Sequence, residues 1–213
     1  MDLAKFIDHT LLKADATVQD VAVLCDEAAA HGFAAVCVNP GYVDLAAHLL
    51  AGCGVKVATV IGFPLGATFS AVKVCEAREA VICRADELDM VMNIGAAKAG
   101  AWDAVEEDIR QVIAAADGRT VKVIVETALL CEGEKIRACQ AVLTTGAQFI
   151  KTSTGFGPGG ATVEDVSLFR SIIGEGRCGI KASGGVRTRQ QAELLIAAGA
   201  TRLGTSAGVS LIK

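Results

Sequence analysis

Short apolar runs rich in β-branched residues recur along the chain, and each run is typical of a buried strand. The runs cover residues 33–38, 55–60, 88–93, 121–126, 149–153, 179–183 and 201–204, with a shorter one at 6–8. Between these runs, apolar residues return with helical spacing. This second pattern predicts helices within residues 18–28, 72–82, 105–113, 136–143, 163–172 and 192–198.

Helix start and stop signals agree with these limits. Candidate capping residues precede three of the helices: Thr17 or Asp15, Thr162 and Thr188. Several helices are followed directly by a glycine, which can adopt the left-handed backbone of a C-terminal cap: Gly32, Gly146 and Gly199. The elements are therefore bounded from both sides.

The alternation of strands and helices predicts a parallel sheet covered by helices. Seven strands are clear and residues 6–8 supply an eighth, the number that closes a (β/α)₈ barrel. A length of 213 residues is near the lower end for that fold, and a doubly wound open sheet is the alternative. No Pro/Ser-rich linker divides the chain, so we expect residues 1–213 to form a single TIM-barrel domain.

Composition narrows the class of protein. The chain is 52% hydrophobic and 21% charged, with a net charge of −4, which excludes a disordered, collagenous or coiled-coil protein. The sequence lacks the clusters of Lys and Arg that are typical of nucleic-acid-binding proteins. It also has no apolar run of the roughly 18 residues that span a bilayer. Without a secretory leader, we expect a cytoplasmic protein. The eight cysteines show no C-x-x-C pair and are expected to be reduced, mostly buried thiols.

Charged residues interrupt several of the predicted strands. Lys56, Lys122, Lys151, Lys181 and Asp89 stand where apolar residues are expected, although lysine is rarely buried without a partner. Lys151 and Lys181 precede glycine-rich turns on consecutive strands, at the barrel end where active sites form. Their ammonium groups are therefore expected to lie within mutual reach.

Two such ammonium groups suggest covalent chemistry. With a pKa of about 10.4, only about one lysine in 2,500 is a free amine at pH 7. Burial and a second cation both favour the neutral form, which can attack a carbonyl and form a Schiff base. The alternative is that the lysines form salt bridges with Asp89 or Glu126. For Lys56 and Lys122 we favour that structural or supporting role.

Glycine-rich turns follow the last three strands, at residues 154–160, 183–187 and 204–208. Their exposed backbone amides suit a phosphate group, and barrels commonly bind phosphate at this position; ordinary tight turns are the alternative. Residues 155–160 spell G-x-G-x-x-G, but they follow a late strand and contain Pro158, so we reject a dinucleotide site. No G-K-[ST] sequence indicates a Walker loop.

Six segments, in order along most of the chain, together resemble the 2-deoxyribose-5-phosphate aldolase family. They are residues 7–12, 36–40, 62–66, 87–91, 149–155 and 181–185. The resemblance implies a (β/α)₈ class I aldolase without metal or cofactor. It also implies cleavage of 2-deoxy-D-ribose 5-phosphate to acetaldehyde and D-glyceraldehyde 3-phosphate, in deoxyribonucleotide catabolism, by a homodimer or homotetramer.

The resemblance also implies roles for individual residues. Lys151 matches the Schiff-base nucleophile, Lys181 the neighbouring cation that lowers its pKa, and Asp89 the acid/base group, with Lys122 in support. The matching substrate-binding positions are Asp8 and Thr10 for hydroxyl groups, Cys37 and Thr154 for the pocket wall, and Gly155, Gly184, Gly185, Gly204 and Ser206 for phosphate.

The chain departs from some family members at three places. Phe156 and Ala207 replace a lysine and a second serine in the phosphate turns, which leaves Arg187 as a candidate charge partner. Some members also end in a tail with a tyrosine that aids proton transfer. The only tyrosine here is Tyr42, so we do not expect protonation by a tail.

Two other functions remain open from the residues. One is a phosphate-binding barrel isomerase or synthase that uses acid/base chemistry without an imine. The other is a catalytically silent protein that binds sugar phosphates. The presence of Lys151, Lys181 and Asp89 argues against the silent protein.

Overall fold

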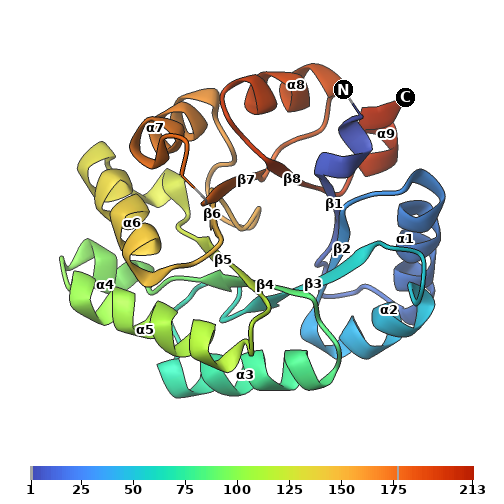
Figure 1. Cartoon of the computed structure of the whole chain (residues 1–213), viewed down its shortest axis with the longest axis horizontal. Helices are drawn as coiled ribbons and strands as arrows, with labels where there is room; N and C mark the ends of the chain where they lie inside the picture. Colours follow the sequence, from blue (N-terminus) through green and yellow to red (C-terminus); the bar gives the residue numbers. More distant parts are fainter. Residues whose placement is uncertain (1, 177) are drawn as a thin grey trace.

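A computed structural model describes residues 2–176 and 178–213, whose strands form one closed parallel barrel with neighbours in sequence order. The strands are β1 (Ile7–Leu11), β2 (Ala35–Val38), β3 (Lys56–Ile61), β4 (Glu87–Val91), β5 (Thr120–Ile124), β6 (Phe149–Lys151), β7 (Gly179–Ser183) and β8 (Arg202–Thr205). Pairing of β1 with β8 closes the ring, which Figure 1 shows along its axis. The predicted barrel is confirmed, and the open-sheet alternative is wrong.

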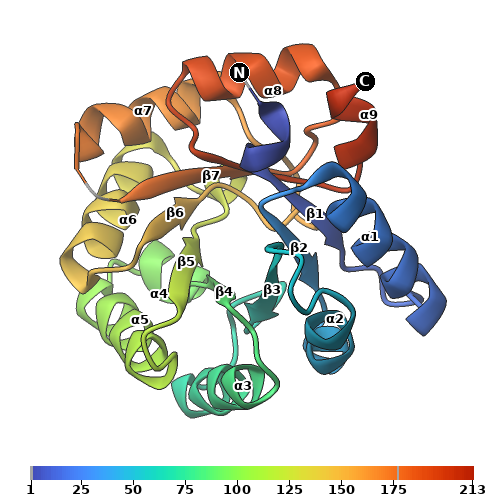
Figure 2. The same ribbon diagram turned by 45° about the vertical axis from the view of Figure 1, so that its right-hand side comes forward.

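Helices surround the barrel on all sides, and Figure 2 shows the same layer from an oblique direction. They are α1 (Val18–His31), α2 (Val43–Leu49), α3 (Ser70–Ile82), α4 (Ile94–Lys98), α5 (Trp102–Ala115), α6 (Glu132–Thr145), α7 (Val163–Ile173), α8 (Arg189–Ala197) and α9 (Gly208–Ile212). Single 3₁₀ turns are η1 (Leu3–Phe6), η2 (Pro40–Tyr42) and η3 (Thr127–Leu129). The six predicted helices are present, whereas α2, α4 and α9 were not predicted.

The predicted helix caps have the expected geometry. Thr17 and Thr188 each form a reciprocal capping box with the third residue of the helix that follows. Thr162 accepts a hydrogen bond from the amide of Asp165 at the start of α7. Gly32 adopts the left-handed backbone at the end of α1, with φ of 60°. These caps fix where the helices meet the barrel.

Side chains alternate between the two surfaces of the barrel wall. On β4, Leu88 and Met90 belong to the large apolar core between strands and helices. Glu87 and Asp89 alternate with them and point into the barrel, where they meet lysines from other strands. The barrel interior is therefore charged on this side.

The opposite side of the interior is apolar. Leu12, Cys37, Ala58 and Val60 form a separate buried cluster, against which Phe63 packs. The interior thus has one apolar wall from β2 and β3 and one charged wall from the remaining strands. No helix among residues 2–176 and 178–213 combines the length and apolar character that crossing a membrane requires.

The cysteines are all free, but the expectation that most are buried is wrong. Four are buried, at positions 25, 37, 139 and 178, while Cys53, Cys75 and Cys131 are exposed and Cys83 is intermediate. The exposed thiols lie on the outer helices and their connections, where the helical pattern alone does not separate the inward from the outward face.

Candidate active site

Three lysine side chains converge on the carboxylate of Asp89 inside the barrel. The Nζ atoms of Lys151 and Lys181 each lie 2.7 Å from Oδ2 of this carboxylate. Lys122 Nζ lies 2.6 Å from Oδ1. The strand register accounts for this meeting, because Asp89 is paired with Lys122 across β4 and β5, and Lys151 with Lys181 across β6 and β7.

A second layer of charge lies beside the first, nearer the end where the strands begin. Lys181 also donates a hydrogen bond to Asp8 Oδ2, and Lys122 Nζ lies 2.7 Å from Glu87 Oε2. Arg202 joins the two carboxylates of this layer, with Nη1 2.6 Å from Asp8 Oδ1 and 3.0 Å from Glu87 Oε2. Asp8, Glu87, Asp89, Lys122, Lys151, Lys181 and Arg202 together are called the ion cluster below.

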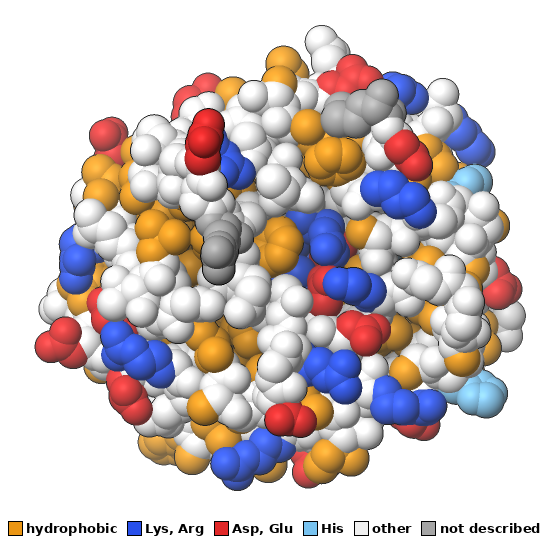
Figure 3. Space-filling model, in the orientation of Figure 1, with side chains coloured by type: hydrophobic (Ala, Val, Ile, Leu, Met, Phe, Trp, Pro, Cys, Tyr) orange, Lys and Arg blue, Asp and Glu red, His pale blue; other side chains and the backbone are white. Residues whose placement is uncertain are grey.

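The ion cluster reaches the surface at the beginning of the strands. Lys56, the first residue of β3, has a half-exposed side chain whose Nζ lies 3.3 Å from Glu87 Oε1. Figure 3 shows Lys or Arg and Asp or Glu side chains gathered at the middle of one end of the barrel. Lys122 therefore forms the expected salt bridge with Asp89, whereas the partner of Lys56 is Glu87 and neither Asp89 nor Glu126, as the sequence had suggested.

The surroundings shift the pKa values of Lys151 and Lys181 in opposite directions. Burial lowers the pKa of Lys181, but the carboxylates of Asp8 and Asp89 outweigh it and raise the pKa overall. Burial and the ammonium group of Lys181 act together on Lys151, outweigh Asp89, and lower the pKa of Lys151. Burial raises the pKa of Asp89, but the three lysines hold it well below its usual range. Lys151 is thus the easier of the two lysines to deprotonate.

A cavity of about 230 Å³ opens at the other end of the barrel, where the strands finish. Of the ion cluster, Lys151 is the only member among the described residues that lines this cavity. The predicted site residues that line it are Thr10, Lys151, Thr154, Gly155, Gly184, Gly185, Gly204 and Ser206. The lysine with the lowered pKa is therefore the one that a ligand in the cavity can reach.

The predicted phosphate turns form one wall of this cavity. Gly184 has φ of 86°, and its carbonyl oxygen lies only 2.2 Å from where a Cβ at position 160 would stand, so the two turns pack backbone against backbone. Lys13 and Arg187 are the cationic residues at the rim. This wall offers backbone amides and two positive charges to an anion.

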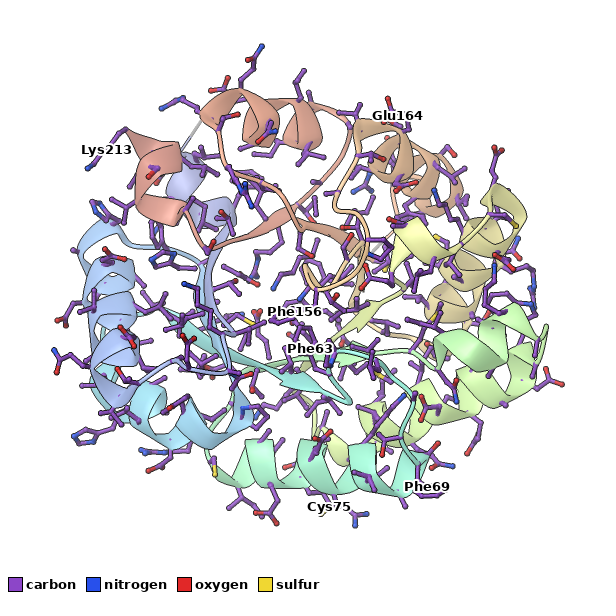
Figure 4. The ribbon with its side chains drawn as sticks, turned by 180° about the vertical axis from the view of Figure 1, so that it is seen from behind. Phe63, Phe69, Cys75, Phe156, Glu164 and Lys213 are labelled. Atoms are coloured by element: carbon purple, nitrogen blue, oxygen red, sulfur yellow. The ribbon has the colours of Figure 1, made fainter. Side chains whose placement is uncertain are left out.

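Phe156 occupies the mouth of the cavity at the position where some family members have lysine. Its ring is 56% exposed and meets Phe63 edge-on, with 5.3 Å between the ring centroids. Figure 4 shows the two rings side by side near the barrel axis, well inside the ring of helices. One side of the entrance is therefore apolar.

Five predicted residues lie deeper than the cavity wall: Asp8, Cys37, Asp89, Lys122 and Lys181. Asp8 is fully buried, and Lys181 and Arg202 bind its two oxygens. Lys122 is fully buried beside Asp89. Cys37 lies in the apolar wall, where burial raises the pKa of its thiol. A direct contact of Asp8 or Cys37 with substrate stays a prediction.

Glu126 does not form the salt bridge with a lysine that the sequence suggested. Its Oε2 accepts hydrogen bonds from the amide (3.2 Å) and the hydroxyl of Thr154, so the salt bridge expected with a lysine is wrong. The Thr154 hydroxyl in turn accepts a hydrogen bond from the amide of Phe156, at 3.0 Å. Glu126 therefore fixes the turn after β6. Glu126 has a left-handed backbone, with φ of 54°, and lies two residues beyond the end of β5, so the strand alternation expected over residues 121–126 does not apply to it.

Candidate metal ligands do not cluster in the part of the chain that the structure describes. No group of three or more His, Cys, Asp or Glu side chains there could hold a metal ion. The three buried carboxylates of the ion cluster are each bound by lysine or arginine.

Comparison with known proteins places the chain in a family. Residues 3–212 match the DeoC/LacD family aldolase. The chain belongs to this aldolase family. The match covers nearly the whole barrel, including all eight strands.

Individual relatives in this family share both sequence and structure with the chain. The deoxyribose-phosphate aldolase of Geobacillus sp. is 56% identical over 213 residues, which cover 100% of this chain and 95% of the relative. The solved structure of an aldolase named QR15 is 43% identical, with a TM-score of 0.95 and coverage of 100% and 95% of the two chains. The deoxyribose phosphate aldolase of Aeropyrum pernix, described as having a unique tetrameric structure, is 35% identical, with a TM-score of 0.92 and coverage of 99% and 89%.

Proposed function

We propose that the chain is a class I aldolase that cleaves 2-deoxy-D-ribose 5-phosphate through a Schiff base on Lys151. The observation that carries this proposal is the position of Lys151. Its pKa is lowered by burial and by Lys181, and it is the member of the ion cluster that lines the cavity. A lysine nucleophile needs both a neutral amine and access to the carbonyl carbon.

The reaction begins with attack of Lys151 Nζ on the aldehyde carbon of the open-chain sugar. The resulting carbinolamine loses water and gives a protonated imine. Loss of the proton on the C3 hydroxyl then breaks the C2–C3 bond, with the electron pair moving into the imine. D-Glyceraldehyde 3-phosphate leaves, and an enamine of acetaldehyde remains on Lys151. Protonation at C2 and addition of water release acetaldehyde and restore the amine.

Asp89 and the other two lysines support these proton transfers. Because Asp89 is ionised, its Oδ2 can accept a proton through a water molecule and return it later to the enamine. Lys181 keeps its proton throughout, since Asp8 and Asp89 both stabilise the ammonium form. Lys122 holds Oδ1 of Asp89 and fixes the carboxylate in place.

The phosphate group of the substrate belongs at the glycine-rich wall. Backbone amides of the turns at Gly155 and Gly184 supply hydrogen bonds there, with Gly204 of β8 and Ser206 beside them. Arg187 and Lys13 supply charge in place of the lysine that Phe156 replaces. Thr10 lines the same cavity and binds a sugar hydroxyl. Asp8 lies below the cavity and affects the reaction through its hydrogen bond from Lys181.

We place the protein in the cytoplasm as a homodimer or homotetramer with no metal or cofactor. The tetrameric Aeropyrum pernix relative supports an oligomer for this chain. Sedimentation of the purified protein would measure the subunit number directly.

The deciding experiment traps the imine. The protein is incubated with acetaldehyde and borohydride, and its intact mass and peptide map are compared with those of Lys151→Ala. We expect an N-ethyl group on Lys151 that is absent in the variant. An adduct on Lys181 would reverse the two lysine roles. A folded protein that gives no adduct in excess aldehyde would contradict the proposal and favour a barrel enzyme that uses acid/base chemistry alone.

A further inference from the structure

Arg202 belongs to the ion cluster, but among the described residues it makes no ion pair with Asp89, the carboxylate that Lys151 contacts. Its Nη1 binds Asp8 and Glu87, and its Nη2 lies 3.3 Å from the second oxygen of Glu87. The guanidinium carbon lies 5.5 Å from the ring centroid of Phe149. Arg202 does not line the cavity, so it acts on the reaction only through other residues.

The charges of the ion cluster do not balance when every member is ionised. Among the described residues it has four cations, which are three lysines and Arg202, and three carboxylates. One positive charge is therefore in excess inside the barrel. An arginine does not lose its proton in proteins, so among the cations of the cluster only a lysine can relieve the excess. The cluster balances when one lysine is neutral.

The geometry selects Lys151 as that lysine. Lys181 is held by Asp8 and Asp89, and Lys122 by Glu87 and Asp89. Within residues 2–176 and 178–213, Asp89 is the one carboxylate partner of Lys151, which shares its Oδ2 with Lys181. It is the lysine with the weakest hold on its proton.

We propose that Arg202 and Glu87 are positioning residues whose fixed charges set the protonation of Lys151, with opposite signs. This inference rests on the proposed function, in which Lys151 must react as a free amine. Arg202 adds a permanent positive charge and keeps Asp8 ionised for Lys181. Glu87 offsets part of that charge and keeps Lys122 protonated.

The seven strands other than β6, which carries Lys151, each hold a titratable or charged group on the barrel interior or its edge. Asp8 and Cys37 come from β1 and β2, and the half-exposed Lys56 from the start of β3. The other groups are Glu87 and Asp89 on β4, Lys122 on β5, Lys181 on β7 and Arg202 on β8. Of these, Arg202 and Glu87 touch neither Lys151 nor the cavity, so their charges can be changed without removing a contact to substrate.

The test measures the pH midpoint at which acetaldehyde and cyanoborohydride modify Lys151, by mass spectrometry of the peptide that contains Lys151. Removing the cation in Arg202→Met should make Lys151 harder to deprotonate and raise the midpoint by roughly 0.5–1 pH unit. Removing the anion in Glu87→Gln should lower the midpoint by a similar amount. Arg202→Lys keeps the charge and should leave the midpoint near that of the unchanged protein.

Two further variants separate charge from structure. The double variant Glu87→Gln/Arg202→Met loses one charge of each sign and should return towards the original midpoint. Arg110→Met removes an arginine that pairs with Glu106 on the outer helix α5 and should change nothing. A general loss of packing would move both single variants in the same direction or alter only the extent of reaction.

The possible results distinguish the two proposals. Opposite shifts in Arg202→Met and Glu87→Gln would support the inference. Equal midpoints, or shifts of the same sign, in proteins that still form the adduct would overturn it and leave the proposed function intact. No adduct at any pH in the unchanged protein would overturn the proposed function itself. If Arg202→Met does not fold, Glu87→Gln and Arg202→Lys still test the sign and the charge dependence.

Discussion

Lys151 and Lys181 are direct register partners on adjacent strands, and their ammonium groups share a single oxygen of Asp89. The pair is not symmetric, because Asp8 accepts a hydrogen bond from Lys181 and has no ion pair with Lys151 among the described residues. The second carboxylate holds the proton on Lys181, so the neighbouring amine is the one that can become neutral. The division of roles between two identical side chains therefore follows from the position of one aspartate.

Replacing Lys181 with methionine should raise the pKa of Lys151, because the nearby positive charge is lost while Asp8 and Asp89 remain. At a pH below the pKa, each unit by which the pKa rises lowers the fraction of free amine about tenfold. We expect at least about a tenfold lower rate of imine trapping at pH 7, with recovery at higher pH. An unchanged pH profile would show that Lys181 does not act through its charge.

Arg187 should contribute to binding of the phosphate group and not to the chemistry at the aldehyde. Arg187→Ala is expected to raise KM for 2-deoxy-D-ribose 5-phosphate about tenfold, because one charged contact is lost. Cleavage of unphosphorylated 2-deoxy-D-ribose should keep its kcat/KM. The matched control is Arg189→Ala, which removes an exposed arginine that pairs with Glu193 on α8. Equal losses with both substrates would contradict this role.

Glu126 should hold the turn after β6 in the shape that receives phosphate. In Glu126→Gln the acceptor of the Thr154 amide and hydroxyl loses its charge, and hydrogen bonds to charged groups are worth about 1.5–3 kcal/mol. We expect KM for the phosphorylated substrate to rise roughly tenfold, with faster amide exchange across residues 154–160. Glu164→Gln, an exposed position at the start of α7 that Figure 4 shows at the rim, is the control. Unchanged exchange would rule out this anchoring role.

Asp8 should make the fold sensitive to acid. Burial raises its pKa, but Lys181, Lys122 and Arg202 outweigh burial and lower the pKa from 3.8 to about 2. A lowered folded-state pKa gives stability that is present above pH 3.8 and is lost as the pH falls towards 2, by about 2 kcal/mol. Urea unfolding measured from pH 6 to pH 2 should show this loss. Asp8→Asn should lower stability near neutral pH and flatten the curve, and a parallel curve would contradict the assignment.

Much of the barrel could be predicted because its wall repeats one simple pattern. Apolar runs such as residues 121–124 and the glycine stops between elements identify strands and helices wherever an element is long enough to show its period. Helices α4 and α9 have five residues each, which is too short for a helical period to appear. Their existence depends on packing against the finished barrel.

The site could be predicted only in part. Lys151, Lys181 and Asp89 stand out because each is a charge inside an apolar strand. Arg202 has the same signal, since Leu203 beside it faces the helices, but it lies at the first position of a strand, where a charge is ordinary. The contact of Glu126 with Thr154 could not be predicted from strand alternation, because the backbone of Glu126 is left-handed and does not follow the strand pattern.

The ion pairs inside the barrel also limit how the sequence can change over time. A lone substitution at position 8, 87, 122 or 202 strands a buried charge, and breaking such a pair typically costs 3–5 kcal/mol. A second substitution that removes the opposite charge relieves most of that cost. We therefore expect these four positions to change in linked pairs across the family. Positions in the apolar wall, such as Ala58 and Val60, should accept single substitutions independently of one another.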